Sequence, residues 1–203
     1  MQLRAENISF KYNKELILND VNLTLNSNEC IGILAPSGYG KTTLAKILAL
    51  HEKPISGNIL IDNIKPSYNG FSKVQLICQH PQESINPRWK MKKVLTESEN
   101  SEKEDIIQAL GIENEWLERY LFELSGGELQ RFNIARALDK RTRFLIADEI
   151  TSMLDTVSQA QVWNYLTGYA KKNQIGMIVF SHNNKLLDKI CTKTIRLDSI
   201  NKI

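Results

Sequence analysis

Three short apolar runs stand out along the chain, and each ends in polar or turn residues. The runs are Cys30 to Leu34, Phe144 to Ala147 and Met177 to Phe180. Runs of this length without charges are typical of strands buried on both faces of a parallel sheet. Two further strands are expected at Asn58 to Asp62 and at Val74 to Cys78. The pattern predicts an α/β fold with a parallel core sheet.

Both ends of the chain add strands to this picture. From Met1 to about Leu34, apolar and polar residues alternate between turns such as Asn26-Ser27-Asn28. Such short alternating strands suit an N-terminal antiparallel β subdomain. A last strand is expected at Lys193 to Leu197, and little chain follows it, so we expect no C-terminal regulatory domain.

Helical periodicity appears in three places. Thr43 to Leu50 follows the first apolar run, and a longer helical stretch lies between Gln79 and Ser125, where Ser101-x-x-Glu104 reads as a capping box. A third helix repeats apolar residues at helical spacing and places Trp163 in the core: Val157, Ala160, Trp163, Leu166 and Ala170. We expect a single domain over residues 1–203, with a small α-helical subdomain inserted over roughly residues 80–135.

Composition limits the class of protein. A chain of 203 residues with 42% hydrophobic content can form one such core. No apolar run approaches the roughly twenty residues of a membrane helix, and no signal peptide is evident, so we expect a protein that is soluble or held at a membrane by partners. A net charge of +3 is too mild to indicate nucleic-acid binding. Cys30, Cys78 and Cys191 are widely spaced, which predicts buried thiols in a reducing compartment and no metal site.

A glycine-rich loop follows the first apolar run and opens into the first helix. It reads Ala35-Pro36-Ser37-Gly38-Tyr39-Gly40-Lys41-Thr42-Thr43. Strand, glycine loop, G-K-T and helix together make a P-loop, in which backbone N–H groups surround a phosphate. Lys41 supplies charge to the terminal phosphates, and the Thr42 hydroxyl can ligate Mg²⁺. The alternative, a glycine turn with a chance Lys-Thr, is disfavoured by this context. Ala35 departs from the motif's first glycine, and its Cβ disfavours a positive φ.

Two carboxylates end the second apolar run, in Phe144-Leu145-Ile146-Ala147-Asp148-Glu149. Open α/β sheets bind ligands at the carboxyl ends of their strands. Asp148 is therefore expected to hold Mg²⁺ through water, and Glu149 to orient or deprotonate an attacking water.

A second anion-binding candidate is Leu124 to Arg131, which reads L-S-G-G-E-L-Q-R. Ser125, Gly126, Gly127 and Glu128 stand where a helix begins, and unpaired N–H groups and the helix dipole attract anions there. An ordinary capped helix is the alternative for this stretch.

In this order, the motifs resemble those of the ATP-binding subunits of ABC transporters, and the resemblance covers nearly the whole chain. It implies a P-loop NTPase fold with a RecA-like parallel core sheet, ATP and Mg²⁺ as cofactors, and ATP hydrolysis. Tyr12 is similar to the aromatic that stacks on adenine, although a packed core aromatic is the alternative. Gln79 resembles the loop glutamine that touches Mg²⁺ and the attacking water. His182 resembles the switch histidine at the γ-phosphate, although a lone histidine is more often structural.

The resemblance also implies a head-to-tail dimer. Each ATP would lie between the P-loop of one subunit and Ser125 to Glu128 of its partner. Ser152-Met153-Leu154-Asp155 resembles the loop that crosses this interface, with Met153 where the family has a smaller or polar residue.

The segment His80 to Arg88, H-P-Q-E-S-I-N-P-R, is similar to the Q-D-P-x-x-S-L-N-P-R stretch of the peptide and nickel importer subfamily. A proline-stiffened loop without subfamily meaning is the alternative. The resemblance implies an importer of nickel, a metal chelate or short peptides, in which the chain pairs with a second ABC ATPase subunit. Two transmembrane permease subunits and an extracytoplasmic solute-binding protein are the other expected partners, at the cytoplasmic side of the cell membrane. The ATPase subunit of an exporter and a non-transport ABC ATPase remain alternatives.

Overall fold

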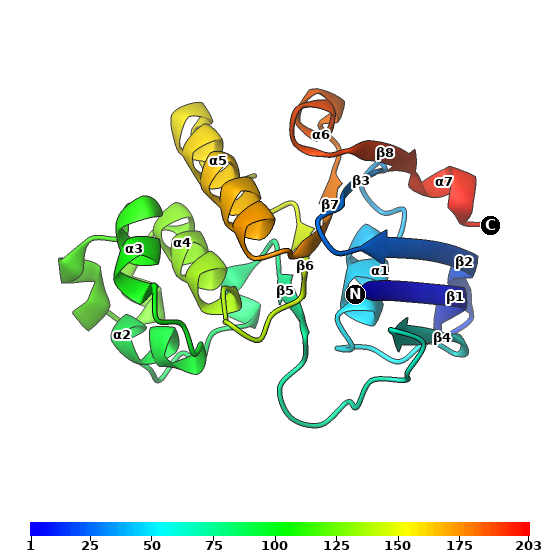
Figure 1. The fold of residues 1–203 in the computed structure, drawn as a ribbon, viewed down its shortest axis with the longest axis horizontal. Helices are drawn as coiled ribbons and strands as arrows, with labels where there is room; N and C mark the ends of the chain where they lie inside the picture. Colours follow the sequence, from blue (N-terminus) through cyan, green and yellow to red (C-terminus); the bar gives the residue numbers. More distant parts are fainter. The chain divides into compact units, whose positions relative to one another are not determined.

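The computed structural model describes all residues from Met1 to Ile203, and they form two compact units. Unit 1 consists of Met1–Leu76, Arg143–Glu149 and Ala170–Ile203, and unit 2 consists of Ile77–Thr142 and Ile150–Tyr169. Figure 1 labels their helices and strands. None of the helices combines the length and the apolar composition that crossing a membrane requires.

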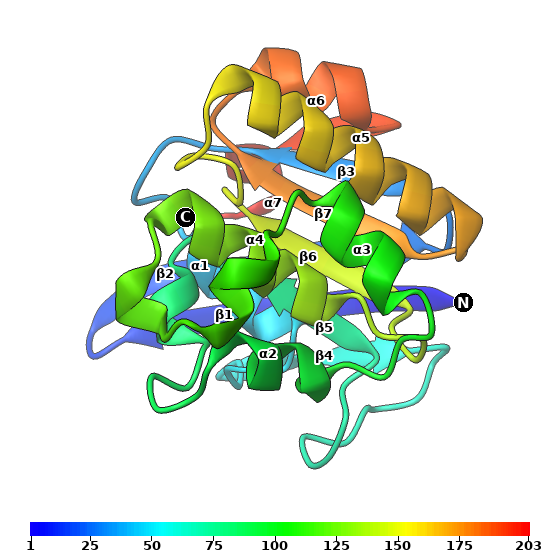
Figure 2. The same ribbon diagram turned by 90° about the vertical axis from the view of Figure 1, so that its left-hand side faces the viewer.

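Unit 1 is built on a five-stranded sheet with the order β5-β6-β7-β3-β8. Its strands are β3 (Cys30–Leu34), β5 (Val74–Ile77), β6 (Phe144–Asp148), β7 (Gly176–Ser181) and β8 (Lys193–Arg196). The pairs β6–β7, β7–β3 and β3–β8 are parallel, and Figure 2 shows β6, β7 and β3 side by side. Every residue of β6 and β7 is buried, which explains their apolar sequences. Helix α1 (Lys41–Leu48) packs on β6, and α6 (Asn184–Ile190) packs on β3 and β7. The predicted parallel core sheet is confirmed.

A second sheet of unit 1 is antiparallel, with the order β2-β1-β4. Strands β1 (Gln2–Tyr12) and β2 (Glu15–Asn26) pair across a two-residue turn, and β4 (Ser56–Ile61) adds to the other edge of β1. The antiparallel part is as predicted, but the expected short strands were wrong. Two long strands form because β-bulges, marked by the register shifts along β1, let one continuous ribbon bend. The apolar run at residues 30–34 joins the parallel sheet instead.

Unit 2 is helical. It contains η1 (Pro81–Glu83), α2 (Met91–Val94), η2 (Leu95–Glu97), α3 (Lys103–Ala109), η3 (Asn114–Glu118), η4 (Leu121–Glu123), α4 (Gly126–Ala137) and most of α5 (Thr156–Lys172). The predicted capping box at Ser101 is wrong: α3 begins at Lys103, and the Glu102 N–H instead donates to Asn100 Oδ1 over 2.8 Å.

Helix α5 confirms one half of its predicted face. Trp163 is 3% exposed, and its indole N–H donates to Thr151 Oγ1 over 3.1 Å. Val157 is 78% exposed, and Ala160, which belongs to the same predicted face, is exposed as well. The helical period was correct, but the assignment of this face to the core was wrong for Val157 and Ala160 and right from Trp163 onward.

The three cysteines are half-buried rather than buried as predicted. Cys30 is the first residue of β3 and Cys191 follows α6, so both stand at the ends of elements. Their Sγ atoms lie 3.4 Å apart, and hydrogen bonding to Cys191 together with burial raises the pKa of the Cys30 thiol. Such a thiol is a poor nucleophile at neutral pH.

Candidate functional site

The carboxyl ends of three neighbouring strands meet at one edge of the parallel sheet in unit 1. In the β3–β7 register Leu34 pairs with Ser181, and in the β6–β7 register Asp148 pairs with Phe180. The segments that follow β3, β6 and β7 therefore leave the sheet side by side. Open α/β sheets bind ligands at this edge.

The loop after β3 has a left-handed backbone at two positions, and both are glycines. Gly38 has φ 83° and Gly40 has φ 85°, and Gly40 is the N-cap of α1 without a side-chain cap. The first N–H groups of α1 thus remain available to an anion. Ala35 is 3% exposed and has a negative φ. Its Cβ therefore costs no backbone strain, and the departure from the first glycine leaves the loop intact.

Lys41 is buried among oxygen atoms. Its side chain is 6% exposed, and Nζ donates to Ala35 O over 2.8 Å and to Pro36 O over 2.9 Å. A third oxygen, Glu149 Oε1, lies 3.1 Å from Nζ. A buried ammonium group requires such partners, and here they fix its position under the loop.

Glu149 joins Lys41 to His182. Its second carboxylate oxygen, Oε2, lies 3.3 Å from His182 Nδ1. Glu149 has φ 48°, a strained backbone for glutamate, and its N–H donates to Phe180 O of β7 over 3.1 Å. The neighbouring strand thus holds this carboxylate in the site.

His182 stands in a fixed turn between β7 and α6. The Asn183 N–H donates to Ser181 Oγ over 3.0 Å, and Asn183 caps α6 by accepting from the Leu186 N–H over 3.2 Å. The imidazole is 65% exposed, whereas the Glu149 side chain is 10% exposed. One nitrogen faces the carboxylate, and the rest of the ring is open to a ligand.

Asp148 is the deepest acid of the site. It is 1% exposed, and its Oδ1 has no hydrogen-bond partner. Burial raises the pKa of this carboxyl and the charge of Glu149 adds to the rise, whereas a hydrogen bond from Thr42 and the charge of Lys41 oppose it. An orphaned buried carboxylate oxygen beside a threonine hydroxyl is a donor set that fits a hard cation such as Mg²⁺.

The other predicted residues of unit 1 lie as follows. Tyr12 ends β1, is 48% exposed and meets Phe10 edge-on, with ring centroids 4.9 Å apart. It is thus not a packed core aromatic, and its ring remains open to stacking. Thr43 is 7% exposed and belongs to the buried face of α1. The remaining loop residues are exposed: Pro36, Ser37, Gly38, Tyr39 and Thr42.

Unit 2 holds the L-S-G-G-E segment at the start of α4. Ser125 Oγ accepts from the Glu128 N–H over 3.3 Å, and Glu128 Oε2 accepts from the Ser125 N–H over 3.1 Å, a complete capping box. A Cβ at Gly126 would lie 2.8 Å from Met153 Sδ. An alanine at this position would therefore force the flexible Met153 side chain to move.

Gln79 also lies in unit 2, where it is half-buried. The preceding carbonyl, Cys78 O, accepts from Gln130 Nε2 over 3.2 Å and from Asn133 Nδ2 over 3.1 Å. Asn133 Oδ1 accepts from the Ser84 hydroxyl over 3.1 Å. Gln130 and Asn133, 1% and 0% exposed, thus fasten the Gln79 loop to α4. Sequence reasoning missed both residues, although polar residues between the apolar positions of a predicted helix were a usable signal.

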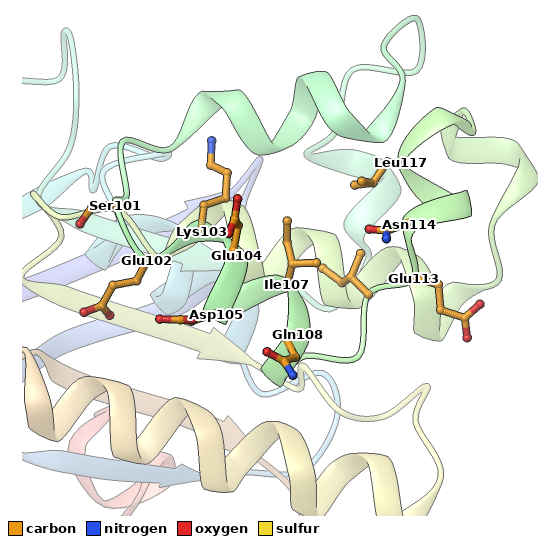
Figure 3. Close-up of a pocket in the computed structure, with 11 residues that line it drawn as sticks. Ser101, Glu102, Lys103, Glu104, Asp105, Ile107, Gln108, Glu113, Asn114 and Leu117 are labelled. Atoms are coloured by element: carbon orange, nitrogen blue, oxygen red, sulfur yellow. The ribbon is translucent and has the colours of Figure 1, made fainter.

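An open pocket of about 1040 Å³ in unit 2 is not part of this site. It is lined by residues of α3, η3 and their flanks, among them Glu104, Ile107 and Leu117 (Figure 3). It contains none of the residues predicted to bind nucleotide.

A glycine loop with a buried lysine between a parallel strand and a helix, facing carboxylates at the end of an adjacent strand, defines a P-loop nucleoside triphosphatase. Residues 18–152 match the family described as "ABC transporter". The chain belongs to this family and is one of its ATP-binding subunits, an ATPase.

Relatives and solved structures agree with this assignment. The chain is 35% identical to the nickel import system ATP-binding protein NikE of Staphylococcus aureus (strain bovine RF122 / ET3-1), over 96% of the chain and 86% of that protein. NikE of strain N315 is 33% identical over the same shares. Among solved structures, the dimeric bacterial ABC transporter cassette MJ0796 superposes with a TM-score of 0.81 at 22% identity, covering 96% of this chain and 93% of that one. CbiO1 from Clostridium perfringens has a TM-score of 0.74, also at 22% identity, and covers 96% and 83%.

Proposed function

We propose that this ATPase is a subunit of an ABC importer that takes up nickel, a metal chelate or short peptides. The observation that carries the proposal is the similarity to nickel import ATP-binding proteins along 96% of the chain. The segment His80 to Arg88, which resembles the peptide and nickel importer subfamily, supports it.

For hydrolysis we assign roles to the cluster in unit 1. Lys41 and the loop N–H groups hold the terminal phosphates, and Tyr12 stacks on the base. Bound Mg²⁺, held by Thr42, Asp148 and Gln79, would neutralise charge on the phosphates. Glu149 accepts the proton of the attacking water on its carboxylate once phosphate replaces it as the partner of Lys41. The exposed ring of His182 contacts the γ-phosphate.

The L-S-G-G-E segment acts on a partner's nucleotide in this proposal. The Ser125 oxygen accepts from Glu128, and its O–H hydrogen remains available to donate to a phosphate. Ser125, Gly126 and Gly127 then complete the site of a second ABC ATPase subunit, with the 152–155 loop beside them. We also assign unit 2 to the helical subdomain expected at roughly residues 80–135.

The loop at Gln79 would connect the ATPase to permease subunits. Hydrogen bonds connect this loop to the body of α4 through Gln130 and Asn133, and α4 is the helix that begins at the L-S-G-G-E segment. With two permeases and a solute-binding protein as further partners, the chain would work at the cytoplasmic side of the membrane.

Uptake in intact cells tests the proposal. A strain lacking the chain is supplied with the wild-type protein or with Glu149→Gln, and the accumulation of radioactive nickel and of a labelled peptide is measured. We expect loss of one of the two uptakes in the deletion strain and in Glu149→Gln, and recovery with the wild type. Unchanged uptake of both, with a labelled compound exported less, would instead identify an exporter.

The dimer is tested separately with purified protein. Glu149→Gln should stop ATP turnover and retain ATP in a dimer during gel filtration, alone or with its partner subunit. Lys41→Ala is the control that should neither bind ATP nor dimerise. Turnover by Glu149→Gln at the wild-type rate would show that another group accepts the proton.

A further inference from the structure

We propose that Asn201 is a positioning residue for nucleotide binding, which acts on the P-loop through β2. The inference rests on the ATPase activity of the family and is independent of the proposed import function. It concerns residues of unit 1 only.

Asn201 follows the short helix α7 (Leu197–Ile200) and reaches the edge of β2, beside which Figure 1 shows α7. Its side-chain Nδ2 donates to Ile17 O over 3.1 Å, and its Oδ1 accepts from the Asn19 N–H over 2.7 Å. One amide side chain thus binds both the acceptor and the donor that β2 presents at these positions. It substitutes for a peptide group of a neighbouring strand.

Lys202 continues this contact with main-chain groups. Its N–H donates to Asn19 O over 3.0 Å, and Asn19 Nδ2 donates back to Lys202 O over 2.8 Å. The Lys202 ammonium group also forms an ion pair with Asp20. The segment 201–202 is therefore fixed on β2 at residues 17–20, although 184 positions separate Asn201 from Ile17.

The stretch of β2 that Asn201 holds lies against the P-loop. A Cβ built on Gly40 would lie 3.0 Å from Ile17 Cγ2, 3.2 Å from Ile17 O and 3.3 Å from Leu18 Cδ2. Gly40 is the left-handed residue that turns the loop into α1, directly before Lys41. Ile17 O, the atom that accepts from Asn201, is one of the three atoms nearest to this Cβ position.

Asn201 is thus connected to the phosphate-binding turn through Ile17, which it binds by a hydrogen bond and which lies beside Gly40. Glycine has no side chain to hold its own conformation, so the turn at Gly40 depends on the atoms that surround it. With Ile17 fixed, the loop N–H groups and Lys41 are preorganised for an anion. Without that hydrogen bond, ordering the loop costs part of the binding free energy.

The test is the affinity for a fluorescent, non-hydrolysable ATP analogue, measured for Asn201→Ala and a matched control. Asn22→Ala is that control, because Asn22 also accepts from one backbone N–H, that of Asn7 over 2.9 Å, and donates to one carbonyl, Asp20 O over 3.0 Å. Each variant loses one bond from a backbone N–H and one to a backbone carbonyl. Only Asn201 bonds to a residue that contacts Gly40.

We expect Asn201→Ala to raise the dissociation constant of the analogue about fivefold, as the loss of the one hydrogen bond to Ile17 O implies. The kcat at saturating ATP should stay unchanged, and Asn22→Ala should leave the affinity at the wild-type level. Asn201→Asp keeps the acceptor for Asn19 and removes the donor to Ile17 O, so it should weaken binding as Asn201→Ala does, and it serves if the alanine variant does not fold. Unchanged affinity in the folded Asn201 variants, or an equal loss in Asn22→Ala, would overturn the inference.

Discussion

Replacing Gly40 with alanine tests how tightly the P-loop turn is packed. Gly38, Gly40 and Gly70 share nearly the same left-handed backbone, with φ of 83°, 85° and 84°. A Cβ at Gly38 or at Gly70 would meet nothing within 4 Å, whereas a Cβ at Gly40 would meet Ile17 and Leu18 at 3.0–3.3 Å. The chain therefore contains two controls with equal backbone strain and no crowding.

The expected losses in the free energy of unfolding follow from the backbone strain and from the crowding around the added Cβ. Left-handed backbone costs an alanine roughly 1–2 kcal/mol, and the lower entropy of its unfolded chain offsets part of this, which leaves about 1 kcal/mol for Gly38→Ala and for Gly70→Ala. At Gly40 the crowding adds about 1–3 kcal/mol, because the neighbours include a backbone carbonyl that cannot rotate away. The predicted loss for Gly40→Ala is thus about 2–4 kcal/mol.

Urea denaturation at neutral pH measures the free energy of unfolding of the three variants. A double-mutant cycle with Ile17→Ala, which removes Cγ2, should recover about 1 kcal/mol of the Gly40→Ala loss if the contact causes it. Equal losses at Gly38, Gly40 and Gly70 would refute the reasoning, since only strain common to all three would then remain.

Three further predictions concern other residues. Ala35→Gly should leave ATP affinity unchanged in a binding titration, because Ala35 already has a negative φ; a large gain would show that its Cβ obstructs the loop. Asn133→Leu should lower the free energy of unfolding in urea by only about 1 kcal/mol, because Cys78 O keeps its bond from Gln130; a loss several times larger would contradict this. Burial alone would raise the pKa of Asp139, but hydrogen bonds from Arg141 and from the backbone lower it to about 2. The stability that this carboxylate contributes is therefore complete above about pH 5 and falls as the pH drops toward 2. Asp139→Asn should remove about 2 kcal/mol of this pH dependence in acid titrations of unfolding.

Local sequence was enough to locate the strands and loops that form the candidate site. The runs that became β3, β6 and β7 were placed to within one residue, because strands buried on both faces must be continuously apolar. The glycines of the P-loop and the acids at the end of β6 could be recognised for a similar reason, since turn geometry and phosphate binding demand particular residues at adjacent positions. Local patterns gave wrong predictions where burial or a helix start depends on tertiary packing. Val157 is exposed, and Ser101 does not cap α3.

Only the tertiary structure determined which of these strands and loops lie next to one another. The sheet order β5-β6-β7-β3-β8 brings Glu149 between Lys41 and His182, residues that stand far apart along the chain. The contact of Asn201 with the strand behind Gly40 has no sequence signal, because an asparagine that completes a distant strand edge looks like any polar surface residue. Periodicity and turn chemistry act over a few neighbouring residues, whereas strand order and edge contacts depend on the path of the whole chain.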